Sequence, residues 1–273
     1  MRIEYIKANP TENKTILVQT SVKRVEQARI ATLLLKNDTD AEQVGFIETA
    51  ERNTAFMRLQ MMGGEFCGNA AISAAALLAK REGIEPMQTR KILLEVSGAA
   101  ELVECGVFFD GKSYIGTVDM PLPNKVEELM LEYKGKEYSF FAVFFPGIVH
   151  LVFSKEGLPN DSDFAEKALK HWSKAIEEEA IGLIGFDEER KEIKPLVYVK
   201  STDSLYWERG CGTGTAAAGV YMSYKRRESV VIPVKQPGGI ITAETVFEKG
   251  ILNELKITGG VFFEEQGFVD IKL

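Results

Sequence analysis

The stretch GGEFCGNAAISAAALLAK, residues 63–80, places Cys67 between a glycine-rich turn and a segment that is apolar on nearly every side. Residues 70–79 are alanine, leucine or isoleucine at every position but one, so a helix here has no polar face and is expected to be enclosed on all sides. A short helix of small residues can be buried by a twisted antiparallel sheet that curls around it. The stretch therefore predicts an α+β fold with a central helix.

A second stretch, RGCGTGTAAAGVYMSYK at residues 209–225, repeats the order of Cys-Gly, small polar residues and an alanine-rich run, this time around Cys211. Inside a helix, Gly219 costs about 1 kcal/mol relative to alanine, which indicates that another element packs closely there. Two copies of the pattern predict two pseudosymmetric lobes, each an antiparallel-rich curled β-sheet wrapped around a central α-helix.

The division between the lobes is expected near residues 121–128, PLPNKVEE, where proline and charge cluster. This boundary gives an N-terminal lobe at 1–122 with the first cysteine and a C-terminal lobe at 123–262 with the second. Residues 263–273 are then expected to form a terminal strand that returns to the N-terminal lobe.

Most of the remaining chain consists of short β-rich runs bounded by glycine or proline, which is typical of antiparallel sheets. Apart from the opening stretch, helices are predicted over residues 26–36, 163–180 and 215–227. The segment 163–180 has apolar residues at helical spacing and charges elsewhere, so it is predicted to be an amphipathic surface helix. The acidic segment around 177–192 is interpreted as a solvated face.

The charge and composition of the chain limit which classes of binding partner are expected. The net charge of −7 argues against nucleic acid and against an anionic membrane surface, which leaves small molecules or proteins. No apolar run reaches the length of a spanning helix and the start lacks a signal peptide core, so a cytoplasmic protein is expected. Three scattered cysteines do not suggest a disulfide framework, and with two histidines and no Cys-x-x-Cys motif no metal site is expected. A homodimer is left open.

A cysteine at a helix start lies beside unpaired backbone N–H groups and the positive end of the helix dipole, which favour its thiolate. The N–H groups of Gly68 and Asn69, and of Gly212 and Thr213, would form an anion site suited to a carboxylate. If both helix starts face one cleft, one sulfur lies on each side of the carbon attached to that carboxylate. One thiolate could then remove the α-proton while the opposite thiol delivers another, as a racemase without a cofactor requires.

Other interpretations of the same residues stay open. A single cysteine in this setting is often only a small buried residue, and Cys105, which lies in a strand pattern, is predicted to be core packing. His150 follows an apolar strand, where it is either a hydrogen-bonded structural histidine or a base that faces the cleft. A binding protein that captures a carboxylate between two helix ends would need the N–H groups but not the sulfurs.

Five segments resemble, in order along nearly the whole chain, motifs of the diaminopimelate epimerase-like family of cofactor-independent amino-acid racemases and epimerases. They are KANPTENKTILV at 7–18, CGNAA at 67–71, VHLV at 149–152, ERGCGTGTA at 208–216 and QPGG at 236–239. The resemblance implies the two-lobed fold, the absence of a cofactor, Cys67 and Cys211 as the catalytic pair, and Asn13 as a substrate contact.

Departures from this pattern concern the far end of the substrate. Ile72 stands where diaminopimelate epimerases usually have an arginine, and FPGIVH at 145–150 lacks an asparagine. Only Gly210 separates the Glu-Arg pair from Cys211, a shorter spacing than in that family. The groups that would hold a second amino-carboxylate are therefore partly missing.

The chain more closely resembles the histidine racemases of bacterial metallophore pathways, through EQVGFIE at 42–48, EFCGNA at 65–70, WE at 207–208 and QPGG. This likeness implies substrate contacts from Glu42, Gln43, Glu208 and Arg209, although Arg209 and Gly210 differ from the uncharged polar pair of those enzymes. A carboxylate such as Glu42 suits an imidazolium or ammonium group, unless it is a solvated loop residue. The predicted function is a racemase for histidine or a similar single-carboxylate amino acid, with diaminopimelate epimerase (LL to meso) as the alternative.

Overall fold

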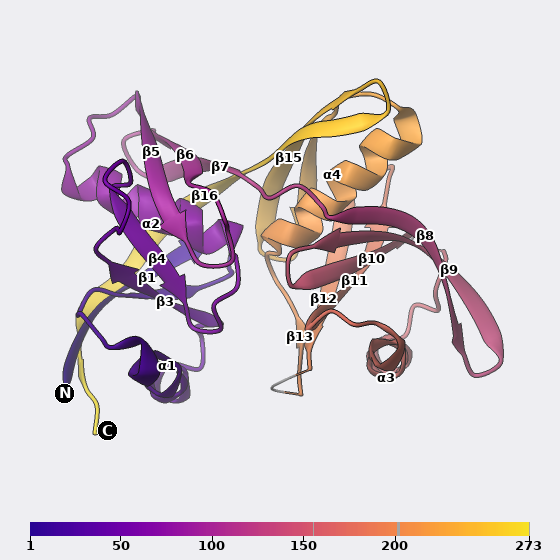
Figure 1. The fold of residues 1–273 in the computed structure, drawn as a ribbon, viewed down its shortest axis with the longest axis horizontal. Coiled ribbons are helices and arrows are strands. Elements are labelled where there is room, and N and C mark those ends of the chain that lie inside the picture. The colour runs from indigo at the N-terminus through magenta and orange to yellow at the C-terminus, as the bar shows by residue number, and fades with distance from the viewer. Residues whose placement is uncertain (155, 201–202, 273) are drawn as a thin grey trace. The chain divides into compact units, whose positions relative to one another are not determined.

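The computed structural model describes residues 1–154, 156–200 and 203–272. It divides into two compact units, the first made of Met1–Asp119 with Ile257–Leu273 and the second of Met120–Lys256 (Figure 1). Both are rich in strands and contain few helices, so the predicted α+β class is confirmed. The expected boundary after residue 262 falls inside a single long strand, and Leu273, the end of the expected terminal segment, lies outside the described residues.

The first unit contains seven strands of its own, part of β16 (Ile251–Asp270), and two helices. They are β1 (Arg2–Pro10), β2 (Thr15–Val18), α1 (Arg24–Asn37), β3 (Gln43–Glu48), β4 (Met57–Met61), α2 (Gly68–Arg81), β5 (Gln88–Val96), β6 (Val103–Phe109) and β7 (Tyr114–Asp119). β1 pairs antiparallel with both β2 and β16, whereas β2 with β3 and β4 with β5 are parallel pairs.

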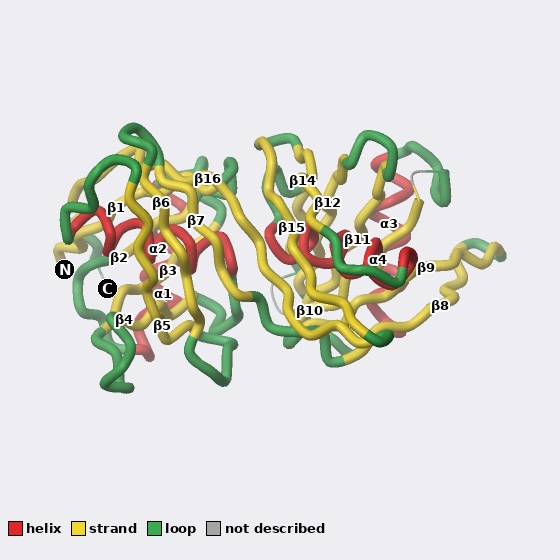
Figure 2. The backbone as a smooth tube through the Cα atoms, turned by 90° about the horizontal axis from the view of Figure 1, so that it is seen from above, coloured by secondary structure: helices red, strands yellow, loops and turns green. Residues whose placement is uncertain are grey.

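Helix α2 lies among the strands of the first unit (Figure 2) and packs against β1, β2, β4, β5, β6 and β7. Every residue from Gly68 to Leu77 is buried, as is Ala79, because the alanine-rich sequence lets strands approach from several sides. A separate core forms where α1 covers β1, β2 and β3, with Ile30 and Leu34 against Phe46 and its neighbours. Each helix therefore has its own apolar contact with the sheet.

The second unit also combines strands with two α-helices. It contains the strands β8 to β15, part of β16, and the helices α3 and α4. Their bounds are β8 (Lys125–Tyr133), β9 (Lys136–Phe145), β10 (Ile148–Ser154), α3 (Ser162–Trp172), the 3₁₀ turn η1 (Ser173–Ala175), β11 (Ala180–Asp187), β12 (Glu192–Val199), β13 (Ser204–Trp207), α4 (Gly212–Arg226), β14 (Val231–Gln236) and β15 (Gly239–Glu248). α4 packs against β9, β10, β11, β14 and β15. A Cβ added to Gly219 would lie 2.8 Å from the Cβ of Ala243 in β15, which is the close packing that this glycine predicted.

The helix predicted over 163–180 is wrong in its last part. α3 ends at Trp172, whose fully buried ring donates from Nε1 to the carbonyl of Glu132, and a single 3₁₀ turn follows. The chain then enters β11, where Ile181 to Ile184 are all buried and pair parallel with β10. The acidic segment 177–192 is therefore not a continuous solvated face, because a core strand occupies its middle.

Among the helices of the described ranges, none is long and apolar enough to cross a membrane.

Candidate active site

Cys67 is the N-cap residue of α2. Its backbone is extended (φ −130°, ψ 111°), and its sulfur accepts the N–H of Ala70 at 3.4 Å. A sulfur in this position replaces the oxygen of a serine or threonine cap, because the first N–H groups of a helix have no partner within the helix. The half-buried side chain of Cys67 therefore lies at the electropositive end of α2.

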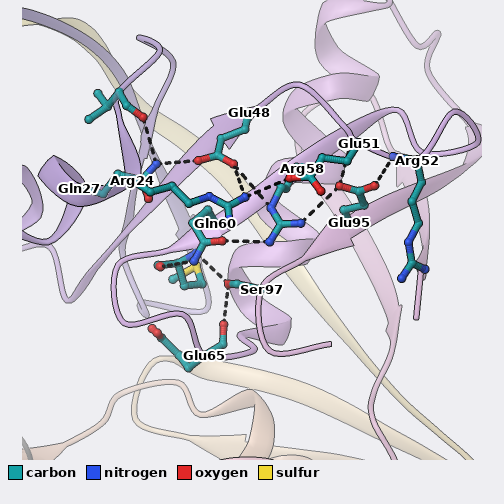
Figure 3. A network of polar contacts seen from close by, with 12 residues as sticks. Arg24, Gln27, Glu48, Glu51, Arg52, Arg58, Gln60, Glu65, Glu95 and Ser97 are labelled. Atoms are coloured by element: carbon teal, nitrogen blue, oxygen red, sulfur yellow. Dashed lines mark hydrogen bonds and ion pairs between the residues drawn. The ribbon is translucent and has the colours of Figure 1, made fainter. Parts of the chain in front are cut away.

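The turn that leads into Cys67 is held by a polar network from β3, β4 and β5 (Figure 3). Ser97, just after β5, donates its hydroxyl to the carbonyl of Glu65 at 2.8 Å and accepts the N–H of Met61 at 2.9 Å. Next to it, Gly98 has a φ of +75°, and a Cβ there would lie 2.3 Å from the nitrogen of Phe66. Only glycine allows this approach, so the end of β5 fixes the turn before the cysteine.

Arg58 and Glu95 continue this network away from the cysteine. Arg58 lies 3.5 Å from Glu95 and 3.6 Å from Glu48, and it donates to the side chain of Gln60 (Figure 3). The backbone N–H groups of residues 51 and 52, followed by Arg58, keep the pKa of the Glu95 carboxyl below its usual range. The network thus joins the loop before β4 to the two strands that support the turn.

Four of the predicted site residues meet around Asn13 in the first unit. Asn13 donates from Nδ2 to Glu42 at 2.5 Å, while its Oδ1 accepts from Gln43 at 2.8 Å and from Asn69 at 3.1 Å. Asn13 and Asn69 are buried, whereas Glu42 is exposed. The structure therefore joins the loop after β1, the start of β3 and the first turn of α2, and it fixes one side of the Glu42 carboxylate.

Cys211 is the N-cap residue of α4 in the second unit and has a similar local geometry. Its backbone is extended (φ −110°, ψ 108°), and its sulfur accepts the N–H of Gly214 at 3.2 Å and lies 3.6 Å from the hydroxyl of Thr213. Each of the two cysteines thus caps a buried helix through the N–H group three residues later.

Gln236, the first residue of the QPGG motif, positions Cys211 but was not among the predicted site residues. Its Oε1 accepts the N–H of Cys211 at 2.6 Å, and its Nε2 donates at 2.7 Å to Thr215, whose hydroxyl donates to the Cys211 carbonyl. The motif itself was the signal that could have identified Gln236, since a buried glutamine at a strand end must find several polar partners.

Glu208 and Arg209 flank the cysteine differently. The half-buried Glu208 acts on the Cys211 thiol both by a side-chain hydrogen bond and by its charge. Arg209 is exposed, and its backbone carbonyl accepts the N–H of Gly238 at 2.7 Å. Its side-chain Nη2 donates to the carbonyl of Pro237 at 3.4 Å. Arg209 therefore holds the turn after Gln236, and Glu208 is the residue of this pair that reaches the sulfur.

The expectation that a helix start favours the thiolate is wrong for Cys211. Burial first, and then the charge of Glu208, raise the pKa of this thiol well above its usual range, although the contacts with Thr213 and Gly214 act in the opposite direction. With 4% of its surface exposed, Cys211 loses more hydration as a thiolate than the helix start restores. Cys105 is fully buried in β6, and burial also raises its pKa, which confirms it as a core residue.

His150 is fully buried on β10, and its Nε2 lies 2.9 Å from the hydroxyl oxygen of Thr213. Burial lowers the pKa of His150 to about 3, so the imidazole is neutral near pH 7 and a poor base there. Of the two interpretations of this residue, the structure supports the hydrogen-bonded histidine. Within the described part of the chain, no three His, Cys, Asp or Glu side chains gather as a metal site would require.

The fold defined by these elements is that of the proline racemase and epimerase structures. A probable proline racemase from Agrobacterium radiobacter K84, solved with bound carbonate, superposes with a TM-score of 0.70 at 12% identity, covering 99% of this chain and 93% of that one. A hydroxyproline epimerase from Agrobacterium vitis, solved with bound trans-4-hydroxy-L-proline, gives a TM-score of 0.66 at 14% identity, covering 98% and 92%.

Sequence similarity assigns the chain to a narrower family than the fold does. Residues 2–269 match the family described as "Histidine racemase CntK N-terminal domain". The histidine racemase of Staphylococcus aureus is 31% identical over 262 residues, which is 93% of either chain, and that of Fusobacterium nucleatum subsp. nucleatum is 32% identical over 275 residues, covering 98% of this chain and 97% of its own. The chain belongs to the histidine racemase family, and it is an isomerase of the amino-acid racemase class.

Proposed function

We propose that this chain is a cofactor-independent racemase of histidine that moves the α-proton between Cys67 and Cys211. The observation that carries the proposal is the shared geometry of the two cysteines: each caps a buried helix of its own unit with its sulfur on the N–H group three residues later. In this proposal the two units are pseudosymmetric lobes that each supply one sulfur. The histidine racemases among its relatives support the choice of substrate.

In the proposed reaction, the substrate carboxylate accepts backbone N–H groups from the first turns of α2 and α4, namely those of Gly68, Asn69, Gly212 and Thr213. These donors stabilise the negative charge that develops on the carboxylate when the α-carbon loses its proton. The breaking C–H bond transfers its proton to one thiolate. The opposite thiol gives its proton to the other face of the same carbon, so the configuration inverts and the two sulfurs exchange roles.

The raised pKa of Cys211 suits the role of proton donor, because this sulfur keeps its proton at neutral pH. In the resting enzyme we therefore assign Cys211 as the acid and Cys67 as the base. In the reverse direction the assignment is exchanged, since each turnover leaves the proton on the other sulfur.

Glu42 is the proposed contact for the ammonium or imidazole group of the substrate. The residue is exposed and its carboxylate accepts from Asn13, and a carboxylate suits a cationic hydrogen-bond donor. Ile72 supports a substrate with a single carboxylate: it is buried, and a Cβ on Gly116 of β7 would lie 2.2 Å from its Cγ2. This position packs the core and offers no cation to a second carboxylate, as diaminopimelate would need.

The cysteine assignment predicts that Cys67→Ser and Cys211→Ser each lower kcat for histidine by roughly 10²- to 10⁴-fold, because a hydroxyl is a far weaker acid than a thiol and is almost never ionised to a base at neutral pH. The measurement is circular dichroism of the racemising amino acid, with deuterium uptake at the α-position in D₂O. Cys105→Ala is the matched control and should keep the parent rate. Full activity of either serine variant would refute the two-sulfur reaction, and histidine binding without any deuterium uptake in the parent would indicate a carboxylate-binding protein.

The substrate assignment predicts that Glu42→Gln raises KM for histidine by roughly tenfold or more, because a neutral amide gives up a charge-assisted hydrogen bond. Glu26→Gln, on the first turn of α1, is the control and should leave KM unchanged. Diaminopimelate is assayed beside histidine with the parent enzyme. Turnover of diaminopimelate alone would transfer the proposal to the epimerase alternative while leaving the sulfur chemistry intact.

A further inference from the structure

We propose that His150 is a positioning residue for Cys211 that acts through Thr213. The imidazole donates its Nε2–H to the threonine oxygen and so directs the threonine hydroxyl hydrogen toward the cysteine sulfur. This inference rests on the proposed function, because it assigns the residues that prepare the second sulfur for proton transfer.

Three side chains form a continuous line in the second unit. His150 Nε2 lies 2.9 Å from Thr213 Oγ1, and Thr213 Oγ1 lies 3.6 Å from Cys211 Sγ. A threonine hydroxyl has one hydrogen and accepts through its lone pairs, so it can donate to only one of its two neighbours. Which neighbour receives that hydrogen depends on which nitrogen of the imidazole carries the proton.

The surroundings of the ring favour the proton on Nε2. Nδ1 is buried and, within the described residues, has no hydrogen-bond partner. If the single proton of the neutral ring were on Nδ1, a buried N–H group would have no acceptor, an arrangement rarer in proteins than an acceptor without a donor. With the proton on Nε2, that N–H group is satisfied by Thr213 and the threonine hydrogen remains available to the sulfur.

Gly182 on β11 keeps the ring in this orientation. It lies opposite His150 in the parallel β10–β11 pair, and a Cβ at Gly182 would lie 2.0 Å from Nδ1. The ring thus occupies the space that any other residue at position 182 would fill. Because His150 is also completely buried, the imidazole has no room to turn Nε2 away from Thr213.

The sulfur benefits most when it is a thiolate, which can only accept hydrogen bonds. It then receives the N–H of Gly214 and the hydroxyl of Thr213, both of which lower the pKa of Cys211 and so offset part of the effect of burial. The first cysteine has a different neighbour: two residues after Cys67 is Asn69, whose amide donates to Asn13. The hydroxyl link therefore belongs to Cys211, and Cys67 serves as an internal control.

The test measures the rate at which iodoacetamide alkylates Cys211, as a function of pH, in a Cys67→Ser background. His150→Leu removes the donor and is expected to shift the profile to higher pH, slowing alkylation roughly three- to tenfold at a given pH below the midpoint. Thr213→Val should have the same effect, while Thr213→Ser keeps the hydroxyl and the parent profile. His150→Gln, whose amide can donate at a similar reach, should restore most of the rate.

The double variant His150→Leu/Thr213→Val decides the route. If His150 acts through Thr213, the double variant alkylates at the rate of Thr213→Val alone. A further slowing caused by His150→Leu in the Thr213→Val background would overturn the proposal, as would a changed alkylation rate of Cys67 when His150→Leu is made in a Cys211→Ser background. Alkylation requires no substrate, so this outcome is independent of whether the protein racemises histidine.

A measurement on the parent protein covers the case in which a His150 variant fails to fold. The chain has two histidines, so ¹⁵N-histidine labelling with His171→Gln leaves one imidazole to observe by NMR. The expected spectrum is that of a neutral imidazole with its proton on Nε2 and no proton on Nδ1. A ring protonated on Nδ1 would refute the inference.

Discussion

Cys211 stands where two effects on the pKa of its thiol oppose each other. A helix start lowers the pKa of a thiol, and that part of the environment is visible in the sequence around Cys211. Burial raises it, and burial depends on β10, β11, β14 and β15, which reach α4 from distant parts of the chain. The sign of the net effect could therefore not be predicted from the local motif.

The acid sensitivity of the fold should depend on His150. Its pKa is lowered by burial from 6.5 to about 3, so between these pH values the unfolded chain binds a proton that the folded chain does not. The free energy of unfolding is therefore expected to fall as the pH drops below 6.5, by about 1 kcal/mol per pH unit between about pH 6 and about pH 4.5. Urea titrations at several pH values measure this slope.

His150→Gln is the control for this prediction, because glutamine does not titrate. Its unfolding free energy should change much less over the same window, whatever its value at pH 7. Equal slopes in parent and variant would show that other groups cause the acid sensitivity.

At the scale of secondary structure elements, the sequence was most informative where a single period or composition ran through a whole element. The alanine-rich runs predicted α2 and α4, and the segment 239–248, GIITAETVFE, coincides with β15. Cysteines at both helix starts could be predicted because the Cys-Gly pattern and the helix are adjacent in sequence.

Elements defined by distant partners were missed. β8 is a charged edge strand whose one partner among the described strands is β9, so its sequence, which follows two prolines, looks like a linker. β11 follows three glutamates, and only its parallel pairing with β10 explains why the chain turns there from helix to strand. In the site, the hydroxyl link from His150 to Cys211 joins residues far apart in sequence, which no local pattern reveals.

Packing between α4 and β15 should make Gly219→Ala unfavourable even though alanine is the better helix former. The new methyl group would lie 2.8 Å from the Cβ of Ala243, and neither group can rotate away. The overpacking costs about 1–3 kcal/mol and the helix-propensity gain is about 1 kcal/mol, so we expect the free energy of unfolding of the second unit to fall by up to about 2 kcal/mol. Urea unfolding followed by tryptophan fluorescence measures the change, because Trp172 and Trp207 both belong to this unit.

Ala243→Gly provides the matched test of this contact. Alone it should destabilise the strand slightly, but combined with Gly219→Ala it removes the clash, so the double variant should lose less than the two single changes together. Additive losses, or a Gly219→Ala variant more stable than the parent, would mean that the two residues do not limit each other.

At the scale of the whole molecule, the strand β16 has a divided role. Its residues up to Lys256 belong to the second unit, and those from Ile257 onward belong to the first, where Val261 to Asp270 pair with β1. The first unit is therefore made of two segments of chain separated by the whole of the second. Its stability therefore depends on residues that lie far along the chain from α2.

Val261→Asp should consequently destabilise the first unit while leaving the second largely intact. Val261 is fully buried opposite Pro10, and a carboxylate there would lose its hydration without gaining a partner, at a cost of about 3 kcal/mol or more. In urea, far-UV circular dichroism reports on both units, whereas tryptophan fluorescence reports on the second alone, which contains Trp172 and Trp207. We expect an earlier transition in the dichroism and an unchanged midpoint in the fluorescence.

Phe262→Asp, at the half-exposed neighbouring position, is the control and should leave both signals near the parent. If Val261→Asp instead moved both transitions together, the two units would unfold as one cooperative body and the independent stability expected of them here would be wrong.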